Sequence, residues 1–392
     1  MALARLCAAG FVAYCSYSMC RVPLLPLFAQ DLGAGPSTIG LVMGASTLTG
    51  VFVKLPAGAL SDVFGRRRLL LTGAAVFATL PFTYLWVGTI APLIILRFLH
   101  GSATAIFGPV AAASLSDIAP RDRRGSWLST YSTAQGTGQA LGPVLGGYLI
   151  GAGRFDLAFI VSGLIGVWVP VVVAGWRGEP SRESNESPWL HFKRGVLEVG
   201  RDRLVLITSA AHAAQFVLNG MLNAFLPLYA REVLRLTAAE IGWLFATQTV
   251  TTLLVRPFIG RLSDRIGRRP IIASGLTLCG SAVFALPAAA SVRGVVAIIV
   301  VYAVGVAITT AATSAYITDV TRRARYGAAH GVFGTIYDIG DAIGPIAGGL
   351  LVATIGYAAT FRLMAAVPIA MAAIFAIGSR SSQRAADTVI LR

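Results

Sequence analysis

The sequence predicts an all-α polytopic membrane protein, with twelve transmembrane helices in two pseudo-symmetric six-helix bundles. Three observations predict this fold class: an apolar composition, a series of long apolar stretches and an internal repeat. Of the 392 residues, 56% are hydrophobic and only 12% are charged, whereas a soluble globular chain carries about 25% charged residues. Such a composition is typical of a chain whose helices lie in lipid.

The apolar stretches have the length that a membrane-spanning helix requires, which is roughly 20 residues. We predict twelve of them, at residues 4–28, 38–60, 69–89, 91–116, 126–150, 157–176, 204–229, 239–260, 270–290, 294–318, 327–353 and 357–378. The first could pass for a signal peptide, but eleven spans follow it, so we expect it to be retained. The short connections leave no room for a soluble catalytic domain, which predicts that the protein is not an enzyme.

Two sequence patterns occur twice, each time 202 residues apart. Residues 58–67 (GALSDVFGRR) return as residues 260–269 (GRLSDRIGRR), and residues 142–147 (GPVLGG) return as residues 344–349 (GPIAGG). The same offset relates Asp117 to Asp319 and Gly125 to Gly327. Two similar halves in an apolar chain are typical of a transporter that rocks one half against the other.

The repeat predicts the domain organisation. We expect an N-terminal six-helix bundle at residues 1–176 and a C-terminal bundle with a short cytoplasmic tail at residues 204–392. Between them, residues 177–203 contain the only long hydrophilic segment, which we interpret as a cytoplasmic linker.

Basic residues gather in every second connection. These connections are residues 66–68, 121–124, 177–203, 265–269 and 322–325. The positive-inside rule places them and both termini in the cytoplasm, so we expect a multi-pass protein of the cell (inner) membrane. This topology accounts for the net charge of +15 and favours the lipid bilayer over nucleic acid as the partner. We expect the protein to be monomeric.

Cofactor chemistry is not indicated. The four cysteines, Cys7, Cys15, Cys20 and Cys279, lie in predicted helices without metal-ligand spacing, and we interpret them as small packing residues. The sequence contains no phosphate-binding loop, which argues against ATP as the energy source. We therefore predict no cofactor and no metal.

Four motifs together cover nearly the whole chain. They are residues 58–68 with their repeat at 260–269, Arg97-x-x-x-Gly101, Gly138-x-x-x-Gly142-Pro143-x-x-Gly146-Gly147, and Pro23-x-x-Pro26. In these motifs the chain resembles the major facilitator superfamily, in its twelve-span drug:proton antiporter branch. The resemblance implies a secondary active transporter that works by alternating access, with proton-coupled efflux (antiport) of a small amphipathic compound. It also implies a role for Arg97 in proton coupling.

The repeated turn predicts a conformational latch. Its residues are Gly58, Asp62, Gly65 and Arg66 in the first copy and Gly260, Asp264, Gly267 and Arg268 in the second. Gly58 allows close approach to a neighbouring helix, Gly65 makes a tight turn, and Asp62 can meet a helix N-terminus or an arginine. Positive-inside topology alone would explain the arginines, but not the repeated Gly-x-x-x-Asp spacing.

The repeated Gly-Pro motif predicts helix bends at Gly142-Pro143 and Gly344-Pro345. Each proline removes a backbone hydrogen bond and bends its helix. Each glycine allows a neighbouring helix to approach closely.

Fifteen of the 17 acids lie in predicted loops or at helix ends, and the exceptions are Asp338 and Asp341. Three residues apart, they share one face of a helix. Burial raises the pKa of a carboxyl group and a nearby cation lowers it, so these acids are candidate proton carriers together with Arg97. The alternative is a structural ion pair with Arg21, Lys54, Arg97 or Arg256.

Candidate substrate-cavity residues are the cations and the polar helix faces. Arg21, Lys54 and Arg256 would attract an anion, although Lys54 and Arg256 could instead reach lipid phosphates. Polar side chains follow one helix face at His212, Gln215, Asn219 and Asn223, and another at Tyr131, Gln135 and Gln139, with Tyr337 at the position equivalent to Gln135. Interhelical hydrogen bonding would also explain these faces.

Two other functions stay open. A transporter of an anionic metabolite or a lipid-like anion is favoured by Arg21, Lys54 and Arg256. A membrane sensor or scaffold that transports nothing is less favoured, and it should tolerate replacement of Asp338 and Asp341 by asparagine.

Overall fold

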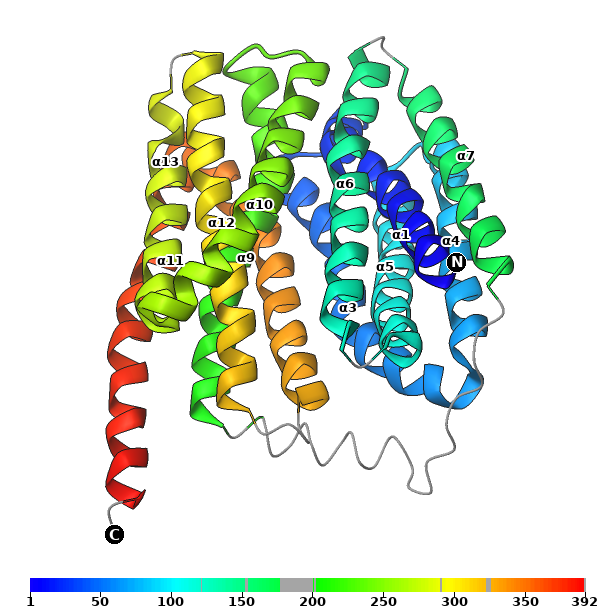
Figure 1. The fold of residues 1–392 in the computed structure, drawn as a ribbon. Helices are drawn as coiled ribbons and strands as arrows, with labels where there is room; N and C mark the ends of the chain where they lie inside the picture. Colours follow the sequence, from blue (N-terminus) through cyan, green and yellow to red (C-terminus); the bar gives the residue numbers. More distant parts are fainter. Residues whose placement is uncertain are drawn as a thin grey trace.

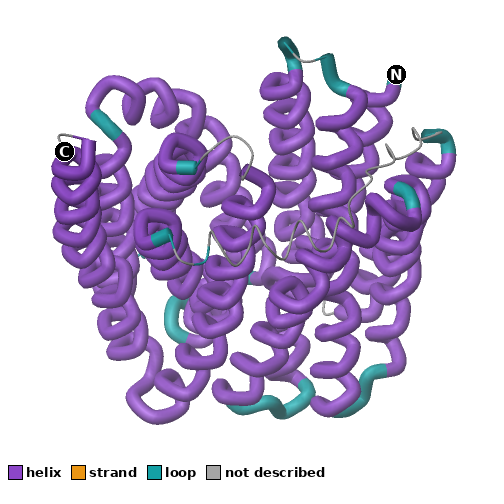
Figure 2. The backbone as a smooth tube through the Cα atoms, turned by 90° about the horizontal axis from the view of Figure 1, so that it is seen from below, coloured by secondary structure: helices purple, strands orange, loops and turns teal. Residues whose placement is uncertain are grey.

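The computed structural model describes residues 1–120, 122–151, 154–176, 200, 202–289, 291–321 and 326–390, and all elements in these ranges are helical (Figure 2). The predicted linker at 177–203 lies almost wholly outside the described residues. The helices of the first half are α1 (Ala2–Met19), η1 (Cys20–Leu24), α2 (Leu25–Asp31), α3 (Pro36–Phe64), α4 (Arg66–Thr83), η2 (Tyr84–Trp86), α5 (Ile90–Ile118), α6 (Arg124–Gly151) and α7 (Phe155–Ala174). Those of the second half are α9 (Arg203–Glu232), α10 (Ala238–Ile266), α11 (Arg268–Ala285), η3 (Leu286–Ala288), α12 (Val292–Val320) and α13 (Tyr326–Ile390).

Within the described ranges, nine helical stretches are long and apolar enough to cross a membrane. Helices α6 and α10 are of similar length, with 28 and 29 residues, but are not among the nine. Helix α13 turns at Gly356, whose φ of 75° lies in the left-handed region, between the two spans predicted there. The total of twelve spans stays a prediction.

The first predicted span is broken rather than continuous. Helix α1 ends at Met19, and a wider turn, η1, leads into α2. Val22 has an extended backbone with φ −143° and ψ 132°, because the proline that follows disfavours the helical conformation and has no N–H to donate. Arg21 lies directly before this break, within the first candidate span.

The two halves lie side by side (Figure 1). Helix α3 of the first half packs on α13 of the second, and α6 of the first packs on α10 of the second. These two interfaces are related by the repeat, since the bounds of α10 are those of α3 displaced by 202 residues at both ends.

The halves approach most closely at one end of the molecule. A side chain at Gly40 would overlap the Pro345 carbonyl, and one at Gly242 would overlap the Pro143 carbonyl. Only glycine lets the backbones come this close. We call the end of the molecule that carries the α3–α4 and α10–α11 turns the basic end. The close contacts lie at the other end, which carries the α2–α3 and α9–α10 connections and which we call the opposite end.

Candidate functional site

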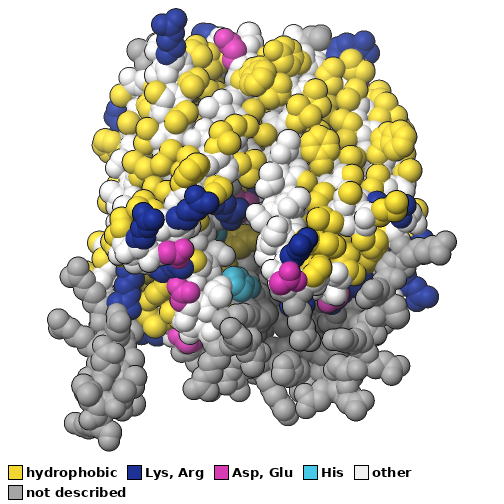
Figure 3. Space-filling model, viewed as in Figure 1, with side chains coloured by type: hydrophobic (Ala, Val, Ile, Leu, Met, Phe, Trp, Pro, Cys, Tyr) yellow, Lys and Arg dark blue, Asp and Glu magenta, His cyan; other side chains and the backbone are white. Residues whose placement is uncertain are grey.

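A hollow lies between the halves in the part of the molecule nearer the basic end. Figure 3 shows the molecular surface hollowed between the two halves on that side. At the opposite end, Gln30 donates a hydrogen bond to Glu232, and Arg231 forms an exposed ion pair with Asp31 at 3.4 Å. The structure therefore has the halves joined at the opposite end and separated toward the basic end.

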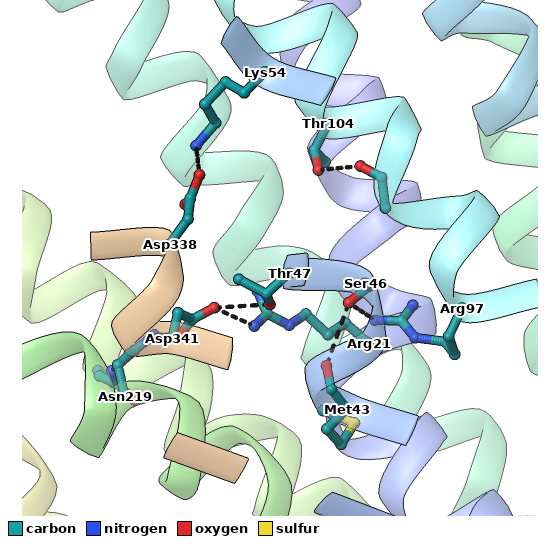
Figure 4. A network of polar contacts seen from close by, with 12 residues as sticks. Arg21, Met43, Ser46, Thr47, Lys54, Arg97, Thr104, Asn219, Asp338 and Asp341 are labelled. Carbon is teal, nitrogen blue, oxygen red and sulfur yellow. Dashed lines mark hydrogen bonds and ion pairs between the residues drawn. The ribbon is translucent and has the colours of Figure 1, made fainter. Parts of the chain in front are cut away.

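Asp341 of α13 lies at the centre of a polar network that joins five elements (Figure 4). Arg21 of η1 forms an ion pair with Asp341 at 2.9 Å, and Thr47 of α3 donates a hydrogen bond to the same carboxylate oxygen at 3.2 Å. Asn219 of α9 donates to the other oxygen at 3.2 Å. Gln248 of α10 donates in turn to Asn219 at 3.5 Å. A carboxylate of the second half is thus held by donors from both halves.

Asp338 has a separate partner. Lys54 of α3 forms an ion pair with Asp338 at 2.5 Å and also donates to the Tyr337 hydroxyl at 3.4 Å. Its ammonium lies 5.0 Å from the centre of the Tyr337 ring. Both membrane acids are therefore paired with cations of the other half.

Arg97 is completely buried, but its hydrogen-bond partners are neutral. Its guanidinium donates to Ser46 at 2.6 Å and to Tyr84 at 3.5 Å, and it lies 5.8 Å from the Tyr17 ring centre. Its Nε has no hydrogen-bond partner in the described chain. Because Ser46 is adjacent to Thr47, Arg97 lies next to the Asp341 network without contacting either acid.

The polar residues of α9 have different surroundings: some pack within the second half, and others face the space between the halves. His212 shares a hydrogen bond of 3.0 Å with Thr313 and stacks on Phe333 at a centroid distance of 4.7 Å. Gln215 is buried without a hydrogen-bond partner among the described residues. Only Asn219 reaches an acid, while Asn223 is partly exposed.

The polar face of α6 makes no contact with the acids. Tyr131 is buried and accepts a hydrogen bond at 3.1 Å from Gln135, one turn away. Gln139 is exposed. The interior hydrogen bonds thus involve α9 more than α6.

Arg256 differs from its repeat equivalent Lys54. Among the described residues it forms no hydrogen bond or ion pair, and its side chain is half-buried. It lies close enough to Tyr337 and His212 to interact electrostatically with both. The structure therefore distinguishes two cations that stand 202 residues apart in the sequence, at equivalent positions of the repeat.

The repeated turns are built alike. Gly65 and Gly267 have φ values of 89° and 98°, a conformation that favours glycine. Arg268 pairs with Asp264 at 2.5 Å and Asp319 at 3.0 Å, and Arg66 pairs with Asp117 at 3.1 Å.

The conformational latch stays a prediction for these turns. The contacts connect helices within one half. A side chain at Gly260 would meet no atom within 4 Å, so close helix approach is absent there in this conformation. The side chains at positions 58 and 62 lie outside the described residues.

The Gly-Pro motifs lie at helix contacts. Gly142 packs on Ser18 and Met19 of the first half, and Gly344 packs on Val217 and Met221 of the second. Pro143 and Pro345 present their carbonyls to glycines across the two halves. The helix bends stay a prediction, whereas the role in close packing is visible.

Sequence reasoning missed several partners of the site. Ser46, Thr47 and Gln248 supply hydrogen bonds to the buried charges and their partners, but single hydroxyl and amide residues in helices carry no distinct signal. The repeat relates Asp117 to Asp319 but does not by itself assign them a partner. Their common spacing after the repeated turn could have indicated them as partners of Arg66 and Arg268.

The described residues form helices in two repeated halves with charged side chains between them, an arrangement typical of membrane transporters. The sequence profile of the Major Facilitator Superfamily matches residues 6–237 and 204–388. The chain belongs to this superfamily, and it is a multi-pass membrane protein.

Relatives and solved structures agree with this assignment. An uncharacterized MFS-type transporter of Methanocaldococcus jannaschii is 26% identical over 357 residues, covering 90% of this chain and 92% of the relative. The multidrug resistance protein MdtG of Escherichia coli is 27% identical over 361 residues, covering 88% and 86%. A bacterial homologue of the human lysosomal transporter Spinster superposes with a TM-score of 0.79 at 16% identity, covering 96% and 95%. The nucleoside transporter NupG superposes with a TM-score of 0.79 at 12% identity, covering 96% and 98%.

Proposed function

We propose that the protein is a proton-coupled antiporter that exports a small amphipathic compound by alternating access. The similarity to a multidrug resistance protein supports efflux. The positive-inside distribution supports a cytoplasmic position for the basic end and both termini. The open hollow would then face the cytoplasm, ready to receive an exported compound.

The main support for the proposal is the presence of two ion pairs that join the halves. Arg21–Asp341 and Lys54–Asp338 each join a cation of the first half to an acid of the second. The Asp341 and Asp338 residues are 5% and 7% exposed. A charge at this depth in a membrane protein is costly, and it is typical of an ion or proton pathway.

Protonation changes the strength of these connections. A neutral Asp341 can still exchange hydrogen bonds with Thr47 and Asn219, but it loses the charge that attracts Arg21. Tyr302 and Asp338 are the other titratable groups near this carboxyl. Proton uptake would therefore loosen one half from the other, and proton release would restore the ion pair. Such a differential interaction is what couples a ligand to a conformational change.

The test is Asp341→Asn in proteoliposomes with an imposed pH gradient. Two naphthyl probes of permanent and opposite charge, naphthalene sulfonate and naphthylmethyl trimethylammonium, serve as substrates. For whichever probe the wild type accumulates, we expect the variant to fall to the level of empty liposomes under the pH gradient. Exchange of that probe without a gradient should persist, because exchange needs no net proton movement.

Controls separate coupling from folding. Removing one partner of a buried ion pair costs about 3–5 kcal/mol, so Asp341→Asn alone could lower stability. Arg21→Gln combined with Asp341→Asn removes both charges and should recover stability without recovering pH-driven accumulation. Asp156→Asn, which removes an exposed carboxylate, should behave as wild type. Full pH-driven accumulation in both Asp341→Asn and Asp338→Asn would overturn the proposal.

A further inference from the structure

The repeat predicts a partner for Arg256 that the chain does not have. The 202-residue offset relates Lys54 on α3 to Arg256 on α10, and it relates Asp338 on α13 to Gly136 on α6. Lys54 and Asp338 form an ion pair across the α3–α13 interface. At the related α10–α6 interface the cation is retained, but glycine stands where the carboxylate would be.

Arg256 faces this α6 interface. A side chain at Gly136 would overlap Leu253 of α10, so Leu253 points at α6. Arg256 is three residues further along α10, and residues at this spacing share a helix face. Arg256 therefore stands on the face of α10 that is turned to the other half, one turn nearer the basic end than Leu253.

The charge of the interior favours an anion at this position. Among the described side chains of the transmembrane interior, four are cations (Arg21, Lys54, Arg97 and Arg256) and two are acids (Asp338 and Asp341). Both acids are already paired with Arg21 and Lys54. Arg97 is completely buried, which leaves Arg256 as the half-buried cation that a compound in the hollow can reach.

An aromatic cluster adjoins Arg256. It consists of His212 and Phe216 on α9 and Phe333 and Tyr337 on α13, with centroid distances of 4.6 Å for Phe216–Tyr337 and 4.7 Å for His212–Phe333. Arg256 lies near the two polar members, His212 and Tyr337. Aromatic faces bind flat apolar groups well, so a cation and an apolar surface lie together.

We propose that Arg256 binds the anionic group of the substrate, which takes the place that the Asp338 carboxylate takes beside Lys54. The substrate class is then a small amphipathic anion whose apolar body packs on the aromatic cluster. This inference rests on the proposed transport function and specifies its substrate. The two repeat-related cations then have different roles: Lys54 connects the halves, and Arg256 binds the substrate.

The first experiment measures charge selection at Arg256. Purified protein in neutral detergent is titrated with naphthalene sulfonate and, in parallel, with the neutral naphthalene sulfonamide, using the rise in melting temperature as the signal. We expect the sulfonate to stabilise the wild type and Arg256→Gln to weaken its binding about tenfold or more. Arg256→Lys should retain most of the binding, and the sulfonamide should not distinguish the variants. No stabilisation by the sulfonate, or equal stabilisation of Arg256→Gln, would overturn the inference.

The second experiment supplies the missing carboxylate. Gly136→Asp would give Arg256 the partner that Lys54 has, whereas Gly136→Asn has nearly the same shape without the charge. Both variants must displace Leu253 to the same extent. We expect the aspartate variant to lose sulfonate binding at least about tenfold relative to the asparagine variant. Equal binding by the two would show that Arg256 does not hold the anion.

A lipid headgroup could offer the same anionic chemistry. Protein in phosphatidylcholine nanodiscs is therefore compared with protein in nanodiscs that contain phosphatidylglycerol. If phosphatidylglycerol stabilises the protein through Arg256 while the sulfonate has no effect, Arg256 holds lipid and the inference fails. If the trimethylammonium probe is accumulated under a pH gradient and the sulfonate is not, the inference fails while the proposed antiport stands.

Discussion

Arg97 shows how a buried charge is accommodated in this fold without an opposite charge. It is completely buried, and Ser46, Tyr84 and Tyr17 surround it with oxygen lone pairs and an aromatic face. A side chain at Gly101 would overlap the Ser46 backbone, so α3 and α5 are in direct contact beside it. The geometry favours a structural role in positioning α3, whose next residue, Thr47, bonds to Asp341.

Ser46→Ala tests this role. The substitution leaves one buried guanidinium nitrogen without its short hydrogen bond, and an unsatisfied buried donor costs about 1–3 kcal/mol. We expect a lower melting temperature in detergent. Ser102→Ala is the matched control, because its exposed hydroxyl bonds only to the carbonyl of Leu99 in the same helix, and it should unfold as the wild type does. A Ser46→Ala protein as stable as the control would contradict the structural role.

At the scale of elements, the halves make their closest contacts where a glycine of one half meets the backbone of a helix of the other half. Gly147 on α6 packs against the Ala238 backbone at the start of α10. The related contact places Gly349 of α13 against the Pro36 backbone at the start of α3. These contacts hold the opposite end closed, and they must separate if the halves rock.

Gly147→Ala should therefore shift the population toward the state that is open at the opposite end. The added methyl group would overlap Ala238 in the present conformation, and overpacking costs about 1–3 kcal/mol. Spin-label distances between α2 and α9 at that end would measure the shift. Gly151→Ala, one turn further along α6, meets no atom within 4 Å and should leave the distances unchanged. Identical distance distributions for the two variants would contradict this account.

The repeated turn makes a separate prediction. Asp319 accepts a hydrogen bond from Arg268 and is 49% exposed, so the contact contributes about 0.2–1 kcal/mol. If the turn is a latch, Asp319→Asn should change the ratio of the two conformations by up to about fivefold. Spin labels on the α3–α4 and α10–α11 turns would report the ratio. Asp122→Asn removes an exposed acid at the same end and should have no effect. If the ratio is unchanged in Asp319→Asn, the turn is not a latch and serves only to set the orientation of the chain in the membrane.

At the scale of the whole molecule, the two ends differ. The halves are in contact at the opposite end, and the repeated turns lie at the basic end. Arg5 near the N-terminus bonds to Gly175, and Arg67 bonds to Trp176, so the N-terminus lies at the basic end. Helix α13 extends to Ile390 at the same end, where Figure 1 marks the C-terminus. Both termini therefore lie at the same end of the molecule.

A reporter fused to the C-terminus tests which side of the membrane this end faces. With both termini in the cytoplasm, a fluorescent protein fusion should be bright and an alkaline phosphatase fusion inactive. Adding lysines to the α2–α3 connection at the opposite end should reduce the fluorescence, because positive charge there opposes the orientation. Phosphatase activity in the unmodified fusion would reverse the topology and the proposed direction of transport.

The sequence by itself determined the fold class, the repeat and most helix bounds. Apolar length and the positive-inside pattern are local properties, and membrane helices satisfy their backbone hydrogen bonds internally. The repeat also indicated that Lys54 and Arg256 are equivalent, and the scarcity of membrane acids identified Asp338 and Asp341 as the exceptions. The prolines of the first span are visible in the sequence, but the break in the helix at Val22, next to Arg21, is not.

Only the tertiary structure decided which charges meet. Asp341 pairs with Arg21, 320 residues away, and Asp338 with Lys54, 284 residues away. Such pairs depend on which helix of one half faces which helix of the other, and no local pattern records that choice. For the same reason the sequence treated Lys54 and Arg256 as alike. Packing of α6 against α10 places Gly136 where a carboxylate could have stood, so Arg256 lacks the partner that Lys54 has.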